Sequence, residues 1–266
     1  GEHAVVYGQP ALAIPLDRGV RVTCEPSPSL RLKSLPASGA QAMVDATNEV
    51  AKAFGSPQVE ITVDSDLPLS AGLGSSAAVS VAMTRALAAS AGRELSDERL
   101  LELALGMERQ FHGRPSGIDH TTCALGYPLR FQMGPPVVVE RLRVPRLEWV
   151  VALSGPRQGT TKEKVAGLRA EYERDPSRLR PLFEQVGQLV ERGQGALLEG
   201  RLADLGRLMN ENQVILTVLG LSTPTIDAMV GRMRDHGALG AKLTGAGGGG
   251  AVIALHPEPH KLVQHM

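Results

Sequence analysis

Apolar positions recur along this chain with two spacings, alternate residues in some stretches and every third or fourth residue in others. Alternation or a short apolar run predicts a β-strand, and the wider spacing predicts an amphipathic helix. The predicted strands cover residues 4–8, 11–16, 20–25, 59–65, 137–144, 147–155 and 250–256. The predicted helices cover residues 40–54, 76–91, 97–113, 161–174, 178–199, 201–219 and 224–236.

Capping and breaking residues set several of these limits. Ser96 is a favoured N-cap residue for the helix that should end at Gly113. Residues 27–39 are rich in Pro and Ser and predict a loop. The elements lack the regular strand–helix–strand rhythm of a doubly wound sheet, so the pattern predicts an α+β fold. We expect two domains, 1–145 and 146–266, that divide near Pro145.

Composition excludes several functional classes. The 266 residues carry 28 basic and 28 acidic side chains, and this balance argues against a nucleic acid or an acidic membrane as partner. Aromatic residues make up only 3%, which argues against base stacking. Cys24 and Cys123 lack metal-ligand spacing and predict free thiols in a reducing compartment. No stretch is typical of a signal peptide or membrane span, so we expect a cytoplasmic protein.

The glycines gather in two stretches, "SAGLGSSAA" at 70–78 and "TGAGGGG" at 244–250. In the first, a strand ends, glycines turn the backbone, and Ser75 and Ser76 open an Ala-rich helix. Such a helix N-terminus binds phosphate through its unpaired amides, although an ordinary glycine turn with an N-cap is the alternative. The stretch matches neither Walker A nor GxGxxG. The second stretch is either a structured loop or a flexible linker, and the apolar "AVIAL" that follows favours the loop.

Two carboxylates stand out between these stretches. Glu108 lies on or beside the apolar face of its predicted helix, where a carboxylate needs a partner. A salt bridge to Arg109 or Arg85, or a solvated flank, would explain it without function. Asp119 sits in the tight loop "PSGID", where a turn or helix cap is the alternative to catalysis.

The chain resembles the GHMP kinases, a superfamily that includes the galactokinases, homoserine kinases, mevalonate kinases and phosphomevalonate kinases. Three motifs carry the likeness in order: "GEHAVVYG" at 1–8, "LPLSAGLGSSAA" at 67–78 and "KLTGAGGGG" at 242–250. The first resembles the mevalonate kinase branch in particular. The resemblance implies a ribosomal protein S5 domain 2-like N-terminal domain, a ferredoxin-like C-terminal domain, and a nucleotide bound between them.

The resemblance also implies a role for each motif residue. Ser76 and Glu108 would hold Mg²⁺, and Asp119, eleven residues after Glu108, would accept or orient the substrate hydroxyl proton. Thr161 matches a family threonine near the active site, with a helix N-cap as the alternative. The substrate-binding set is Glu2, His3, Ser116, Asp119, Thr161, Gly245 and Ala246. The nucleotide-binding set is Pro68, Leu69, Ser70, Ala71, Gly72, Leu73, Gly74, Ser75, Ser76, Ala77 and Ala78.

The sequence departs from the family pattern in three places. The family has a lysine just before Gly-Glu-His that pairs with the catalytic aspartate, so we expect a first strand to be missing ahead of Gly1, and Lys162 and Lys242 are weak substitutes. His120 stands where relatives often have Asn or Ala. The loops near 26–40 and 172–180 are short for the family.

The expected activity is ATP-dependent phosphorylation of mevalonate, with Mg²⁺ as cofactor and a homodimer as the family assembly. Another GHMP kinase is the first alternative, but galactokinases have the polar "GEHTDYN" where this chain has Ala4, Val5 and Val6, and phosphomevalonate kinases depart from the Gly-Glu-His-Ala-Val pattern. A non-catalytic ligand sensor is the second alternative. The retained Ser75, Ser76, Glu108 and Asp119 disfavour a sensor.

Overall fold

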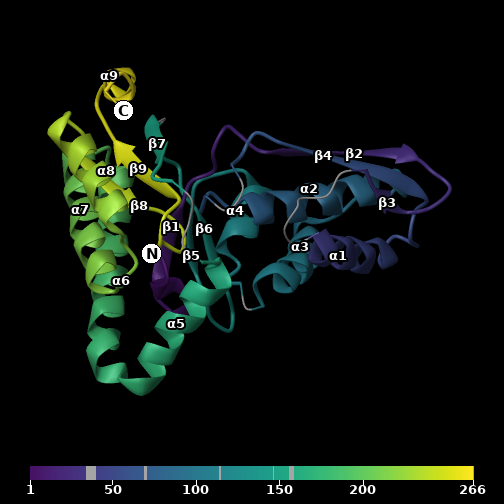
Figure 1. Ribbon diagram of the computed structural model, residues 1–266, viewed down its shortest axis with the longest axis horizontal. Coiled ribbons are helices and arrows are strands. Elements are labelled where there is room, and N and C mark those ends of the chain that lie inside the picture. Colours follow the sequence, from purple (N-terminus) through teal and green to yellow (C-terminus); the bar gives the residue numbers. More distant parts are fainter. Residues whose placement is uncertain (34–39, 69–70, 114, 146, 156–158, 266) are drawn as a thin grey trace. The chain divides into compact units, whose positions relative to one another are not determined.

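The computed structural model describes residues 1–33, 40–68, 71–113, 115–145, 147–155 and 159–265. Residue contacts divide the chain into two compact units, neither of them continuous in sequence (Figure 1). The first unit comprises Gly1–Ala13, Ser70–Leu73 and Pro128–Met266, and the second comprises Ile14–Leu69 and Gly74–Tyr127. The predicted division into sequence domains 1–145 and 146–266 stays a prediction, because compact units and family domains need not share limits.

The second unit packs helices against a small sheet with the strand order β2-β4-β3. Strand β2 (Val20–Pro26) runs antiparallel to β4 (Val59–Ser65), and β3 (Arg31–Leu32) runs parallel to β4. The helices are α1 (Ala40–Lys52), α2 (Ser75–Ser90), α3 (Asp97–His112) and α4 (Ile118–Leu125). Buried Ile61, Met83 and Met107 join sheet and helices in one core. This core fixes α2 and α3, the helices that carry Ser76 and Glu108.

The first unit contains two antiparallel sheets, with strand orders β1-β5-β6 and β7-β9-β8. The strands are β1 (Pro10–Ala13), β5 (Leu129–Gln132), β6 (Val138–Arg141), β7 (Trp149–Leu153), β8 (Gly240–Leu243) and β9 (Ala251–Leu255). A short 3-10 helix, η1 (Ala4–Tyr7), precedes β1. The α-helices are α5 (Thr161–Arg174), α6 (Pro176–Leu198), α7 (Leu202–Val218), α8 (Pro224–Asp235) and α9 (Pro259–Val263).

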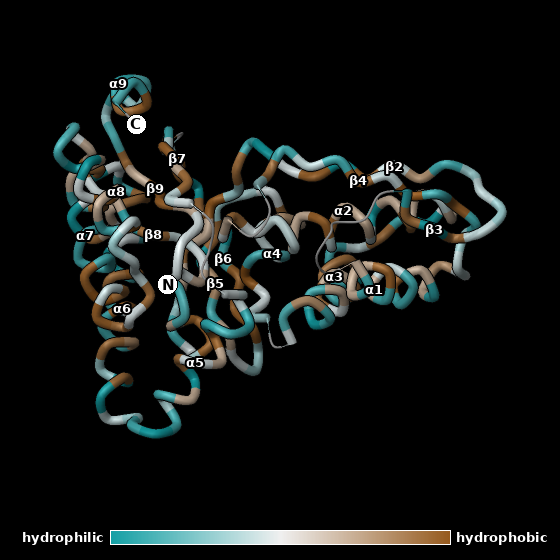
Figure 2. The backbone as a smooth tube through the Cα atoms, in the orientation of Figure 1, coloured by the Kyte–Doolittle hydropathy of each residue, from teal (hydrophilic) through white to brown (hydrophobic). Residues whose placement is uncertain are grey.

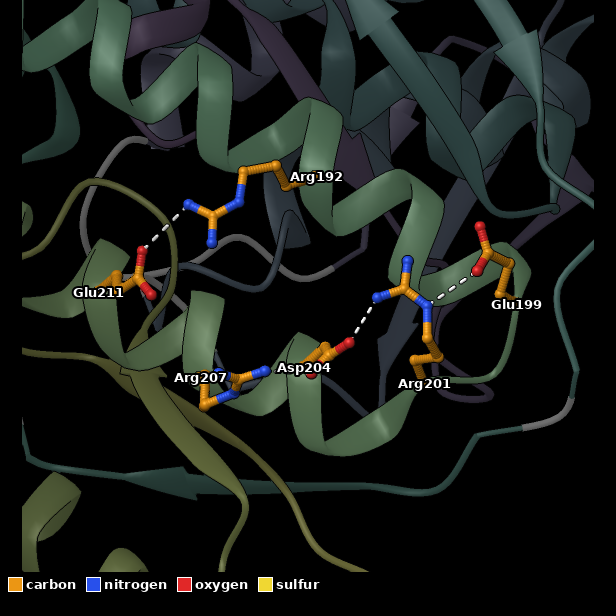
Figure 3. Close-up of polar contacts among 6 residues, drawn as sticks. All are labelled: Arg192, Glu199, Arg201, Asp204, Arg207 and Glu211. Atoms are coloured by element: carbon orange, nitrogen blue, oxygen red, sulfur yellow. Dashed lines mark hydrogen bonds and ion pairs between the residues drawn. The ribbon is translucent and has the colours of Figure 1, made fainter.

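Helices α6 and α7 form an antiparallel pair in this unit. Hydrophobic and hydrophilic residues alternate along α6 (Figure 2), and its apolar face buries Leu179, Phe183 and Val186 in the core. On the exposed side, Arg201 bonds Glu199 at 2.8 Å and also pairs with Asp204 at the turn between the helices (Figure 3). Exposed ion pairs of this kind contribute little stability, so the buried face holds the pair together.

Helix α7 lies directly on β8 because glycines allow the approach. A Cβ atom added at Gly240 would lie 2.2 Å from the Gly206 carbonyl oxygen, so neither position accepts a larger side chain. The Asn210 side chain accepts a hydrogen bond from Ala241 N at 3.1 Å, and Gln213 Oε1 accepts one from Leu243 N at 2.9 Å. The helix thereby satisfies the edge strand and fixes the segment that leads into the second glycine stretch.

The structure confirms most predicted elements to within a few residues and corrects one. The predicted strand 4–8 is instead the 3-10 helix Ala4–Tyr7, because the flanking residues His3, with φ +56°, and Gly8, with φ +82°, curl the chain at both ends. The predicted loop 27–39 contains strand β3, and its residues 34–39 lie outside the described part. Elements α4, β5, β8 and α9 were not predicted. Within the described part, no helix is both long and apolar enough to cross a membrane.

Candidate active site

The first glycine stretch ends on an uncapped helix. Gly72 and Gly74 have φ of +82° and +70°, a conformation that favours glycine, and α2 begins at Ser75. Gly74 is the N-cap residue and offers no side-chain acceptor, and the first helical bond runs from Ala78 N to Gly74 O at 2.9 Å. The amides of Ser75, Ser76 and Ala77 therefore precede the first intrahelical donor and can receive an anion. Leu69 and Ser70, both predicted nucleotide contacts, lie outside the described residues.

A cluster of polar side chains joins the first turns of α2 to the last turns of α3. Ser76 Oγ lies 2.8 Å from His112 Nε2 and 3.5 Å from Glu108 Oε2, and Ser80 Oγ donates to Glu108 Oε1 at 3.2 Å. Both helices present residues four apart, Ser76 with Ser80 and Glu108 with His112, which places each pair on one face. Sequence reasoning missed Ser80 and His112, and their four-residue spacing to the predicted ligands was the one signal that could have found them.

Glu108 is held in surroundings that disfavour its charge. The residue is 3% exposed, and burial followed by the nearby charge of Asp119 raises the pKa of Glu108 to about 7, against the opposing hydrogen bonds from Ser76 and Ser80. The alternatives without function are therefore wrong: Glu108 is no solvated flank, and among the described residues its ion-pair partner is His112, with Nε2 at 3.9 Å, and not Arg85 or Arg109. A carboxyl group placed like this gains from a nearby cation.

Asp119 lies in the first turn of α4, beside the start of α2. Gly117 precedes this helix with φ +96°, and Ser116 Oγ accepts a 3.4 Å hydrogen bond from Ile118 N. A Cβ atom added at Gly74 would lie 3.7 Å from Asp119 Cβ and 3.8 Å from its Cγ. The second unit thus brings Asp119, Glu108 and Ser76 to the N-terminal end of α2.

Two further titratable side chains share α4 with Asp119. His120 is buried, and burial together with the charge of Arg109 lowers the pKa of His120 to about 4, so it is neutral at pH 7. Burial, with the charges of Asp119 and Glu108, raises the pKa of the Cys123 thiol to about 12, which leaves it unreactive. The departure from the family at His120 therefore adds no charge near Asp119.

The second glycine stretch is a structured loop, so the linker alternative is wrong. Gly248 N donates to Leu221 O at 2.8 Å, and Ala251 N donates to Ala71 O at 2.7 Å. A Cβ atom added at Gly245, where φ is +75°, would lie 2.8 Å from Gly72 Cα. The backbones of the two glycine stretches therefore touch within the first unit, and only glycine fits at Gly245.

The opening Gly-Glu-His segment packs against this same loop. His3 is buried, and its Nε2 lies 3.0 Å from the Ala246 carbonyl oxygen. Glu2 forms an ion pair with Lys242, whose Nζ also donates to the Leu243 carbonyl at 2.8 Å. Burial alone would raise the pKa of Glu2, but the Lys242 ammonium outweighs it and holds that pKa well below its usual range. The first unit therefore gathers Glu2, His3, Gly245 and Ala246, together with a lysine that sequence reasoning rated as a weak candidate.

Thr161 is the first residue of α5, and its neighbour is the cap. Thr160 Oγ1 accepts from Glu163 N at 3.1 Å while Glu163 Oε2 accepts from Thr160 N at 2.6 Å, a capping box. The N-cap alternative for Thr161 is therefore wrong, because Thr160 is the cap residue.

Comparisons with known proteins agree with this arrangement. The family model of the GHMP kinases N terminal domain matches residues 41–127, and that of the GHMP kinases C terminal domain matches residues 194–264. Together the two family models cover more than half of the chain, so the chain is a GHMP kinase by family.

Individual relatives show to which family of the GHMP kinases the chain is most similar. Mevalonate kinases from Thermococcus onnurineus and Pyrococcus horikoshii are each 36% identical over 97% of this chain, which spans 86% and 85% of their lengths. The crystal structure of L. major mevalonate kinase in complex with R-mevalonate matches all of this chain and 87% of its own with a TM-score of 0.89 at 27% identity. The chain therefore belongs to the GHMP kinases, and within them to the family of the mevalonate kinases.

Proposed function

We propose that the protein transfers the γ-phosphoryl group of ATP to the primary hydroxyl of mevalonate, giving 5-phosphomevalonate for isoprenoid biosynthesis. The observation that carries the proposal is the placement of Asp119 and Glu108 at the uncapped start of α2, a place for triphosphate, cation and acceptor hydroxyl together. Its relatives of 36% identity are mevalonate kinases, and the L. major relative was solved with R-mevalonate.

Each site residue at or near the start of α2 has a role in this proposal. The first-turn amides of α2 and the Ser75 hydroxyl bind phosphate oxygens, and the stretch from Pro68 to Ala78 binds the nucleotide. Asp119 accepts the proton of the substrate hydroxyl or orients it toward the phosphorus, which is the demand of a loose phosphoryl-transfer transition state. Ser116 holds the start of α4, so that Asp119 stays in place.

The oxygen donors near α2 fit Mg²⁺. Glu108 and Ser76 provide a carboxylate and a hydroxyl that lie 3.5 Å apart, and the pKa of Glu108, raised by burial and by Asp119, marks a place that favours a cation. No cluster of three or more His, Cys, Asp or Glu that could hold a metal occurs in the described part of the chain, and Mg²⁺ in kinases is bound by one or two carboxylates plus phosphates. When bound, the ion would neutralise phosphate charge.

In the first unit, Glu2, His3, Gly245, Ala246 and Thr161 are proposed as substrate contacts. The buried His3 is tied to Ala246, so it presents a fixed imidazole. The proposal includes a cytoplasmic location and a homodimer, both implied by the family. Light scattering on the eluting protein tests the dimer.

A coupled ADP-release assay tests the activity. MgATP is combined in parallel with mevalonate, phosphomevalonate, homoserine and galactose. We expect turnover with mevalonate, and a loss of about 10²–10⁴-fold in kcat for Asp119→Asn with nucleotide affinity kept. Asp97→Asn, an exposed aspartate in the first turn of α3, is the matched control and should retain full activity.

The other outcomes separate the alternatives. Turnover with another acceptor alone would contradict the mevalonate assignment while keeping the kinase. Intact nucleotide binding without turnover on any acceptor would support the sensor.

A further inference from the structure

Lys242 lies in β8, a strand in which every residue is buried. Its side chain is 7% exposed, and Nζ donates to the Glu2 carboxylate and to the Leu243 carbonyl. A buried ammonium is costly unless it is paired and hydrogen-bonded. Lys242 meets this demand with a carboxylate from the opposite end of the sequence.

The strand that carries Lys242 is itself fixed. Leu243 N donates to Gln213 Oε1 at 2.9 Å, and Gln213 Nε2 donates to Ser222 Oγ at 3.1 Å. Gln213 is 6% exposed and belongs to α7, which packs against β8. Lys242 therefore extends from a rigid support toward Glu2.

The segment that carries Glu2 needs such a support. His3 follows it with φ +56° and ψ −42°, a sparsely populated conformation that costs a non-glycine residue about 1–3 kcal/mol. The contacts that hold this segment include the Glu2–Lys242 ion pair and the contact between His3 Nε2 and the Ala246 carbonyl oxygen at 3.0 Å. Strain held by specific contacts is typical of functional segments.

We propose that Lys242 is a positioning residue for the acceptor substrate: it fixes the Glu2 carboxylate in one place and neutralises its charge. The inference rests on the proposed function, in which Glu2 and His3 contact mevalonate. Mevalonate carries a carboxylate, and an unpaired buried anion at Glu2 would repel it. The pair lets an acidic side chain face an acidic substrate.

Removing the ammonium alone tests the charge. Lys242→Met should raise the KM for mevalonate about tenfold or more, with the KM for ATP changed by less than about twofold. Lys242→Arg keeps the charge and should restore most of the mevalonate KM. Lys261→Met is the matched control, because it breaks an exposed ion pair with Glu258 and should change neither KM.

A double-mutant cycle tests whether Lys242 acts through Glu2. In a Glu2→Gln background, Lys242→Met should change the mevalonate KM by less than about twofold further, because no anion remains to position. The proposal would be overturned if Lys242→Met raised the mevalonate KM equally in the wild-type and Glu2→Gln backgrounds. It would also be overturned if Lys242→Met raised the KM values for mevalonate and for ATP equally. If Lys242→Met alone fails to fold, the double variant is compared directly with Glu2→Gln, because the double variant leaves neither charge of the pair unpartnered. A tenfold difference in the mevalonate KM between those two variants would overturn the proposal.

The cycle is run on whichever acceptor the wild-type protein phosphorylates. Turnover of another acceptor in place of mevalonate would contradict the proposed function and leave the cycle measurable. If the acceptor is neutral, as galactose is, an unchanged KM for it in Lys242→Met would support charge neutralisation. A tenfold rise in that KM would overturn charge neutralisation.

Discussion

Glu108 shows how one buried carboxyl group couples folding to pH. Its pKa is raised to about 7 in the folded chain, whereas an unfolded Glu titrates near 4.3. The folded state therefore binds the proton more tightly, and the stability that Glu108 contributes is present below about pH 4 and lost as pH rises through about 7. The folded protein without Mg²⁺ should lose stability across this range.

The variant Glu108→Gln measures this effect, because it keeps the shape and removes the titration. Between pH 4.5 and pH 8, the wild-type free energy of unfolding should fall by about 3 kcal/mol more than that of the variant, at about 1.36 kcal/mol per pKa unit. Urea unfolding in the presence of a chelator gives both curves. Parallel curves would contradict the raised pKa of Glu108.

The residues of the site differ in how far the sequence can predict them. Glu108 and Asp119 were singled out by the resemblance of their stretch to the family, and the structure brings both near the start of α2. His112 and Ser80 join the cluster only because α2 packs on α3, and Lys242 pairs with Glu2 across 240 positions. Contacts of such sequence separation leave no periodic signal in a single chain.

At the scale of elements, amphipathic spacing predicted α1, α7 and α8 closely, because one face of each helix is buried. Strand β8 gave no strand signal, since it is short and carries a lysine at a fully buried position. Helix α4 was hidden by Asp119, His120 and two threonines, all weak helix formers. These two elements form because of their tertiary contacts, which the local preferences of their residues do not reveal.

The loop at 244–250 provides a prediction at this scale. Gly245→Ala combines an unfavourable φ with a Cβ atom 2.8 Å from Gly72 Cα, so it should cost about 2–4 kcal/mol of stability and weaken ATP binding. Gly200→Ala is the matched control: its φ is +68°, but a Cβ atom there meets nothing within 4 Å.

The control should cost only about 1–2 kcal/mol and leave ATP affinity unchanged. Chemical denaturation and a nucleotide titration measure both quantities for each variant. Equal losses at the two glycines would mean that backbone conformation matters and the contact between the glycine stretches does not.

For the whole molecule, binding of nucleotide and Mg²⁺ should raise the free energy of unfolding. A non-hydrolysable ATP analogue with Mg²⁺ at about 100 times its Kd should raise the free energy of unfolding by about 2.7 kcal/mol. In Glu108→Gln, the part of this gain that depends on Mg²⁺ should disappear, and the part given by nucleotide alone should remain. Thermal unfolding with and without a chelator separates the two parts. Retention of the Mg²⁺-dependent gain in the variant would contradict Glu108 as a ligand.

The interleaved path of the chain has a consequence for how the protein is made. The first unit takes its opening residues, Gly1–Ala13, from one end and most of its bulk, from Pro128 on, from the other. Strand β1 finds its partner β5 only when residue 132 has emerged from the ribosome, and Glu2 meets Lys242 later still. The Gly-Glu-His segment thus waits without this ion pair until Lys242, 240 positions further along, has been made, and the charge arrangement proposed for substrate binding cannot form before then.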